Sequence, residues 1–278
     1  MNEREIQRWL RRKKNSLIAT PTKKFSECLF KVLYYSSVFL YGVIVLYNRP
    51  WAWDLHQAYH NLPMHPIDGH ITNYYIIQLA YYTACLVTLP VDNRRKDFVE
   101  LVIHHIATVL LIAFSWYTNL WKVGTLVMVI HDAADVFLEI AKTFNYAGYQ
   151  EIANHGFTVF AISFFFTRLV LFPIVIKSVI EKPVEIIFYE ESLYDYVTKG
   201  HVVVSHVTFS VLLCILLALH VFWFSIIAKM AMSMITEPVS KDVRSDDEYG
   251  FSTDEEQENA RKQAITNAQE RKENKKEE

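Results

Sequence analysis

The chain has 278 residues, of which 52% are hydrophobic and 14% aromatic, and its formal net charge is −2. Long apolar runs fill residues 32–234, whereas charged residues gather at both ends. This division excludes an ordinary soluble domain and is typical of a membrane protein with several spans and soluble ends. The net charge says little about partners, because it averages a basic amino end and an acidic patch in the tail.

The three cysteines indicate which kinds of covalent or metal site are not expected. Cys28, Cys85 and Cys214 show no paired spacing, and two of them lie in apolar runs. This pattern favours neither a disulfide framework nor a thiolate metal site. We therefore predict that they are buried small hydrophobic residues.

The amino end, residues 1–31, is basic and contains the runs RWLRRKKN and TPTKKF. We predict a cytosolic segment that is attracted to anionic lipid rather than one that binds nucleic acid. A cleavable signal peptide is not expected, because the first apolar run starts only near Val32 and lacks a small-residue cleavage pattern.

Six apolar runs predict membrane-spanning helices at about residues 32–47, 72–91, 98–117, 119–142, 152–179 and 201–228. The fifth run is long enough to need a tilt or a bend at Pro173. The basic amino end and the run Arg94, Arg95 and Lys96 are two spans apart, which predicts that both lie on the cytosolic side and that both termini are cytosolic. The predicted fold class is therefore all-α, a single bundle of about six transmembrane helices around a central cavity within residues 32–234.

Two polar loops are expected on the lumenal side. Trp51 and Trp53 mark the membrane interface before the first loop. That loop carries His56, His60, His65, His70, Pro63 and Pro66. Because no acid or thiol stands at ligand spacing, we interpret it as a polar loop and not as a metal site. The second loop covers residues 181–200.

The tail, residues 235–278, is charged, lacks apolar periodicity and is predicted to be disordered. Ser245, Ser252 and Thr253 precede acidic residues, so they are either sites for an acidophilic kinase or parts of a solvated charge cluster. The last four residues, KKEE, match a dilysine retrieval signal of the endoplasmic reticulum.

Ionisable residues at membrane depth are the candidate functional residues, because a charge in lipid is costly. His104 and His105 lie in the third run, and Asp132 and Asp135 lie in the fourth. If these two helices are antiparallel, His104 and Asp135 share one level, roughly 10 Å from the cytosolic face at about 1.5 Å per residue. Asp132, Asp135 and Glu139 lie at i, i+3 and i+7, so a helix presents them as a single stripe. This stripe is expected to face the histidines across a cavity.

Other polar residues are candidates for the cavity or its support. His131 and Glu139 either hold an aspartate by hydrogen bonds or pack helices together. His220 lies at the level of His104 and is expected to line the cavity. Arg168 lies deeper, and we expect a structural ion pair there.

The segments IHHIATVLLIAFSW and GTLVMVIHDAADVFLEIAKTFNYAG resemble the signature of the ceramide synthases, the acyl-CoA-dependent N-acyltransferases of the TLC-domain superfamily. The resemblance extends more loosely over residues 7–256. It implies transfer of a fatty acyl group from acyl-CoA to sphinganine or a related long-chain base in the endoplasmic reticulum membrane, with no metal or prosthetic group. It also implies contact with membrane lipid and pairing with a second copy or with another ceramide synthase.

The resemblance assigns essential roles to His104, His105, Asp132 and Asp135. In one route a carboxylate holds the amine cation while a neutral imidazole takes its proton. In the other route a histidine attacks the thioester and forms an acyl-imidazole, which the amine then opens. Under either route His105, His131 or a backbone N–H is a candidate donor to the oxyanion.

The resemblance also carries expectations for other segments. The nucleotide of acyl-CoA would approach the cluster Arg94, Arg95 and Lys96. The loop before the last span bears on acyl chain length in ceramide synthases, and the matching stretch here is residues 181–200, in which residues 186–189 would close the cavity. QRWLRRKKN is similar to the last helix of a homeodomain-like segment, but this remnant is too short for a three-helix homeodomain, so no nucleic-acid partner is expected.

Two other classes are alternatives. A proton-coupled transporter or a non-enzymatic lipid-binding protein would use the buried histidines and aspartates as a relay, but the chain shows no internal repeat and no broken-helix pair. A membrane di-iron hydroxylase or desaturase needs several histidine clusters at short spacing, and this chain has one HH pair.

Overall fold

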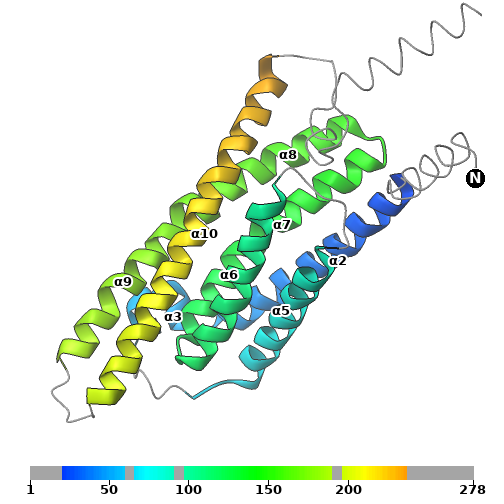
Figure 1. The fold of residues 1–278 in the computed structure, drawn as a ribbon. Coiled ribbons are helices and arrows are strands. Elements are labelled where there is room, and N and C mark those ends of the chain that lie inside the picture. Colours follow the sequence, from blue (N-terminus) through cyan, green and yellow to red (C-terminus); the bar gives the residue numbers. More distant parts are fainter. Residues whose placement is uncertain (1–20, 60–65, 91–96, 190–195, 237–278) are drawn as a thin grey trace, which may run out of the picture.

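The computed structural model describes residues 21–59, 66–90, 97–189 and 196–236, and all regular structure in these ranges is helical. The long helices are α2 (Pro21–Tyr47), α5 (Gly69–Thr88), α6 (Phe98–Tyr117), α7 (Trp121–Tyr146) and α10 (Tyr196–Thr236). A further rod consists of α8 (Gln150–Phe164), the π-helix η1 (Phe165–Leu171) and α9 (Phe172–Tyr189), and two short helices, α3 (Pro50–Trp53) and α4 (Leu55–Ala58), follow α2. Figure 1 shows an elongated bundle, which confirms the all-α class.

The described helices include four that are long and apolar enough to cross a membrane: Thr22–Tyr47, Phe98–Tyr117, Gln150–Glu181 and His206–Met234. α5 and α7 are also long, but α5 is rich in tyrosine and α7 carries the acidic residues. Large apolar side chains such as Leu33, Ile76 and Val211 are exposed on the outer faces of the bundle, as contact with lipid requires. A polytopic membrane protein is confirmed, whereas the count of six spans stays a prediction.

α7 is the central helix, and α2 and α8 pack along its length. Small residues permit this close approach. A Cβ built at Gly42 of α2 would collide with Val129 of α7, and one built at Gly156 of α8 would lie 3.2 Å from the Cβ of Ala141. The glycines therefore bring both neighbours against the helix that carries the acidic residues.

A tight turn makes α6 and α7 antiparallel. α6 ends at Tyr117, and Asn119 in the turn has a φ of 62°. Asparagine tolerates this left-handed conformation better than most residues do. The bounds predicted for the third run, residues 98–117, are those of α6, whereas α7 extends to Tyr146 instead of ending near Lys142.

The prediction of a lumenal loop at residues 181–200 is wrong, because most of these residues are helical. α9 continues to Tyr189 and α10 begins at Tyr196, so residues 190–195, which lie outside the described residues, separate the two helices. The polar composition of this segment was the reason to expect a loop, but helices that end in water tolerate such residues. Residues 186–189, which were expected to close the cavity, form the last turn of α9, and residues 190–194 lie outside the described residues.

Two expectations for single residues are also wrong. Trp51 does not face an interface: it is buried, and its ring packs edge-on against Trp121 at 5.8 Å. Cys214 is exposed on α10 and Cys85 is half-buried, so only Cys28 is a buried cysteine. Trp53, with 78% of its surface exposed, still fits an interface position.

Asp68 ties the end of α2 to the start of α5. Its carboxylate accepts the backbone N–H of His70 at 3.2 Å and pairs with Arg49. The hydrogen bond from His70 and the nearby Arg49 cation hold the pKa of Asp68 below its usual range. An ion pair and a helix cap thus hold the residue before α3 next to the start of α5.

Several predicted features lie outside the described residues. They are the basic segment at residues 1–20, the histidines His60 and His65, the cluster Arg94, Arg95 and Lys96, the phosphorylation candidates Ser245, Ser252 and Thr253, and the KKEE signal.

Candidate functional site

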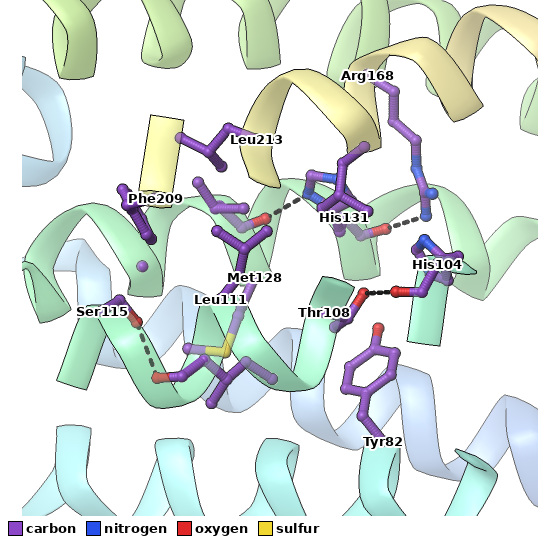
Figure 2. Close-up of a pocket in the computed structure, with 14 residues that line it drawn as sticks. Tyr82, His104, Thr108, Leu111, Ser115, Met128, His131, Arg168, Phe209 and Leu213 are labelled. Carbon is purple, nitrogen blue, oxygen red and sulfur yellow. Dashed lines mark hydrogen bonds between the residues drawn. The ribbon is translucent and has the colours of Figure 1, made fainter. Parts of the chain in front are cut away.

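A narrow cavity runs along the inside of the bundle between α5, α6, α7, η1 and α10 (Figure 2). Its free volume is about 30 Å³, enough to admit water but little more. Its lining consists of Tyr82, His104, Thr108, Leu111, Ile112, Ser115, Gly124, Val127, Met128, His131, Arg168, Phe209, Leu213 and Leu216.

The cavity is long because one face of α6 lines it from His104 to Ser115, which is roughly 16 Å at about 1.5 Å per residue. Ionisable residues lie at the His104 end, and the rest of the lining is mostly apolar, with hydroxyl groups at Thr108 and Ser115. At the far end the Tyr75 hydroxyl lies 3.0 Å from both the Ser115 hydroxyl and the Trp121 carbonyl. A side chain at Gly124 would collide with Tyr75, so this glycine allows the far end to close.

His104 lies where α6 meets α10. Trp223 of α10 packs edge-on against the His104 ring at 5.3 Å and donates its indole N–H to Asp97 at 3.0 Å. The adjacent His105 turns toward Tyr82, whose ring centre is 6.1 Å away, and His105 is not part of the lining. Only one histidine of the HH pair therefore faces the cavity, as the 100° between successive helical residues requires.

Asp135 and Arg168 form the ion pair expected for Arg168. Nη2 of Arg168 lies 2.9 Å from both carboxylate oxygens of Asp135 and also donates to the His131 carbonyl at 2.9 Å. The Arg168 side chain is 5% exposed and that of Asp135 is 21% exposed. The pair therefore neutralises two charges at the polar end of the cavity.

The ring of His131 has a defined tautomer. Its Nδ1 lies 2.6 Å from the Val127 carbonyl, which only accepts, so Nδ1 carries the proton. In a neutral ring Nε2 then has a lone pair and no hydrogen. The rings of His220 and Phe172 pack against His131 at 4.8 Å and 4.7 Å.

Asp132 is fully buried and faces α5 rather than the cavity. Its Oδ2 accepts from the Tyr74 hydroxyl at 3.0 Å and from the Gln78 amide. Glu139 pairs with Lys142 at 3.3 Å. The acids therefore turn toward different partners, and the prediction that they face the histidines as one stripe is wrong.

The structure brings the predicted residues together but divides them between the cavity wall and its surroundings. His104 and His131 line the cavity, whereas His105, Asp132, Asp135, Glu139 and His220 lie behind the lining. Sequence reasoning missed Tyr74, Gln78 and Tyr82. Their spacing of four residues on α5 was the available signal, since it places them on one helix face.

An all-helical bundle with ionisable side chains buried at membrane depth and an apolar cavity beside them defines a polytopic membrane protein with an internal polar site. Residues 24–229 match the family model described as TLC domain. The chain belongs to the TLC-domain family.

Similar proteins include several animal ceramide synthases. Ceramide synthase 4 of Bos taurus is 37% identical over 252 residues, which cover 90% of this chain and 61% of that protein. Ceramide synthase 5 of Homo sapiens is 36% identical, with 88% and 60% covered, and ceramide synthase hyl-1 of Caenorhabditis elegans is 37% identical, with 81% and 61% covered. The chain thus spans about three fifths of the length of these curated relatives.

Proposed function

We propose that this protein is a ceramide synthase that transfers a fatty acyl group from acyl-CoA to the amine of sphinganine or a related long-chain base. The observation that carries the proposal is the cavity, in which an ionisable cluster around His104 opens onto a long apolar lining. Such a cavity suits a substrate with one reactive polar end and one hydrocarbon chain. The similarity to ceramide synthases supports the same assignment.

The acyl chain would lie along the apolar lining with its thioester beside His104. Pockets that hold a small ligand usually measure about 300–1,000 Å³, far more than the free volume here. The cavity must therefore widen when the substrate enters. The contact between Trp223 and His104 is where α10 would separate from α6.

The chemistry requires only groups that the two substrates and the cavity supply. The amine nitrogen attacks the thioester carbon, the carbon–sulfur bond breaks, and the amine proton leaves with a base while coenzyme A departs as the thiol. His104 is the candidate base, because it is the member of the HH pair that lines the cavity. His104 is equally placed to attack the thioester first and to pass the acyl group to the amine.

Asp135 has a different role from that of a free carboxylate. Because Arg168 occupies both of its oxygens, Asp135 would hold the arginine rather than the substrate ammonium. Asp132 keeps one carboxylate oxygen without a hydrogen-bond partner among the described residues, but it lies behind the lining, so the widened cavity would have to extend to it before it could attract the ammonium.

The setting of the reaction belongs to the same proposal. We place the protein in the endoplasmic reticulum membrane with both termini cytosolic, and the nucleotide of acyl-CoA would approach from that side. Membrane lipid and a second ceramide synthase copy are the expected partners, and no cofactor is needed because the reaction balances between the two substrates.

The test is to purify the protein and offer it a panel of acyl-CoAs with sphinganine. Products would be identified by mass, and free thiol would be counted. We expect one amide and one thiol for each turnover. Thiol release without amide, or neither product, would contradict the proposal, and the latter result is what a lipid-binding protein or a transporter would give.

A further inference from the structure

Arg168 lies at a break in the helical rod formed by α8, η1 and α9. Pro173 has no N–H, and its ring would clash with the carbonyl four residues earlier, so the helix widens just before it. The N–H of Phe172 accordingly bonds to the Thr167 carbonyl, five residues back. Wide turns of this kind occur often at functional sites.

The wide turn keeps Arg168 on the inner face of the rod. Phe164, Arg168 and Phe172 are all buried at successive spacings of four residues. In a regular α-helix the direction of such residues drifts by about 80° over eight residues, at about 100° per residue. The extra residue of a π-turn cancels most of this drift, so Pro173 helps to direct the guanidinium inward.

The guanidinium is held by one of its three nitrogens. Nη2 contacts the Asp135 carboxylate and the His131 carbonyl, and this uses both of its N–H groups. Nε is buried without a hydrogen-bond partner, and Nη1 has only a 3.4 Å contact with Nε2 of His220. A guanidinium that is held mainly through Nη2 thus still has N–H groups on Nε and Nη1 that can donate to a substrate.

These donors lie at the reactive end of the cavity. Arg168 and His104 both line it, and Figure 2 shows the guanidinium pointing toward His104. His131 is a poor alternative donor, because Nδ1 already donates to Val127 and Nε2 of the neutral ring has no hydrogen. His105 is turned away from the lining. The Thr108 hydroxyl already donates to the His104 carbonyl at 2.8 Å. Tyr82, also in the lining near His104, has a neutral hydroxyl donor.

We propose that Arg168 is a catalytic residue of acyl transfer, in which its guanidinium donates hydrogen bonds to the oxyanion that forms from the thioester carbonyl. This role rests on the proposed function. When the nucleophile bonds to the carbonyl carbon, the π electron pair moves to the oxygen and the charge forms beside the guanidinium. When that pair returns, the carbon–sulfur bond breaks and coenzyme A leaves. A donor that is already held in place serves this step without reorganisation.

The first test compares Arg168→Lys and Arg168→Met with Lys177→Ala, a control that removes an exposed cation from the same rod. Loss of one oxyanion donor usually lowers kcat by about 100- to 1,000-fold. We expect such a loss in both Arg168 variants, with KM for acyl-CoA changed by less than about threefold, since the lost interaction forms only in the transition state. Activity in either Arg168 variant that equals that of Lys177→Ala would overturn the role.

Removal of Arg168 leaves Asp135 unpaired, so a loss of activity could come from a disturbed structure. The second test therefore measures a property that depends only on the hydrogen bond to the oxyanion. An acyl-CoA analogue with sulfur in place of the carbonyl oxygen accepts hydrogen bonds weakly, so the wild-type protein should prefer the oxygen substrate. In Arg168→Lys the single ammonium would pair with Asp135 and leave the oxyanion without its donor, so we expect this preference to fall by about tenfold or more. Equal losses on both substrates, or a reduced preference in Tyr82→Phe alone, would overturn the role of Arg168. A wild-type protein that makes no amide would overturn the proposed function itself.

Discussion

The ion pair with Arg168 changes what is expected when Asp135 is replaced. An intramembrane carboxylate alone is costly, and its removal would be expected to leave folding intact. Here the carboxylate compensates Arg168, whose side chain is 5% exposed. Replacing Asp135 with asparagine would leave that buried cation without its charge partner.

We therefore predict that Asp135→Asn loses acyl transfer and also loses stability. Breaking a buried ion pair costs about 3–5 kcal/mol, and the lower end applies because the Asp135 side chain keeps some exposure. Thermal unfolding of the detergent-solubilised protein would measure the change, with Glu151→Gln, an exposed acid on α8, as the control. An unchanged midpoint would mean that Arg168 finds another partner.

At the scale of an element, α6 and α10 are joined at the polar end of the cavity by the hydrogen bond from Trp223 to Asp97. Because Trp223 also packs against His104, this bond holds α10 against the polar end of the cavity. Trp223→Phe keeps an aromatic ring but removes the donor, and Asp97→Leu removes the acceptor. Each change should cost about 1 kcal/mol of unfolding free energy.

If the two side chains act through one bond, the double variant should be little worse than either single variant. Thermal unfolding of all three variants would measure this. Additive losses would show that Trp223 and Asp97 stabilise the protein independently, in contradiction of the link between α6 and α10.

Prediction from sequence succeeded for features that depend on local composition. The α6 bounds followed from a mostly apolar run, and the Arg168 ion pair followed from the cost of an isolated cation. The partners of Asp132 were not predictable, because Tyr74 and Gln78 lie more than 50 residues away along the chain. The π-turn before Pro173 was also missed, since apolar periodicity does not reveal a single added residue.

At the scale of the whole molecule, the described helices return to the end of the bundle where they start. Figure 1 shows that the first turns of α2 and the last turns of α10 lie at the same end. With the positive-inside rule, this arrangement predicts that both termini are cytosolic. Tags at residue 1 and residue 278 should be cut by protease in sealed microsomes, and a tag within residues 53–69 should be protected. Opposite protection of the two terminal tags would mean an odd number of spans.

The central claim is that acyl transfer takes place at the polar end of the cavity, beside His104. The most direct measurement is the rate of amide formation by purified wild type, His104→Ala and His155→Ala, since His155 is an exposed histidine on α8. Loss of an acid–base group usually costs about 100- to 10,000-fold, and loss of a nucleophile costs at least as much. We predict a fall of this size in His104→Ala and a wild-type rate in His155→Ala. If His104→Ala forms the amide as fast as His155→Ala does, the reaction does not depend on His104 and the account is contradicted.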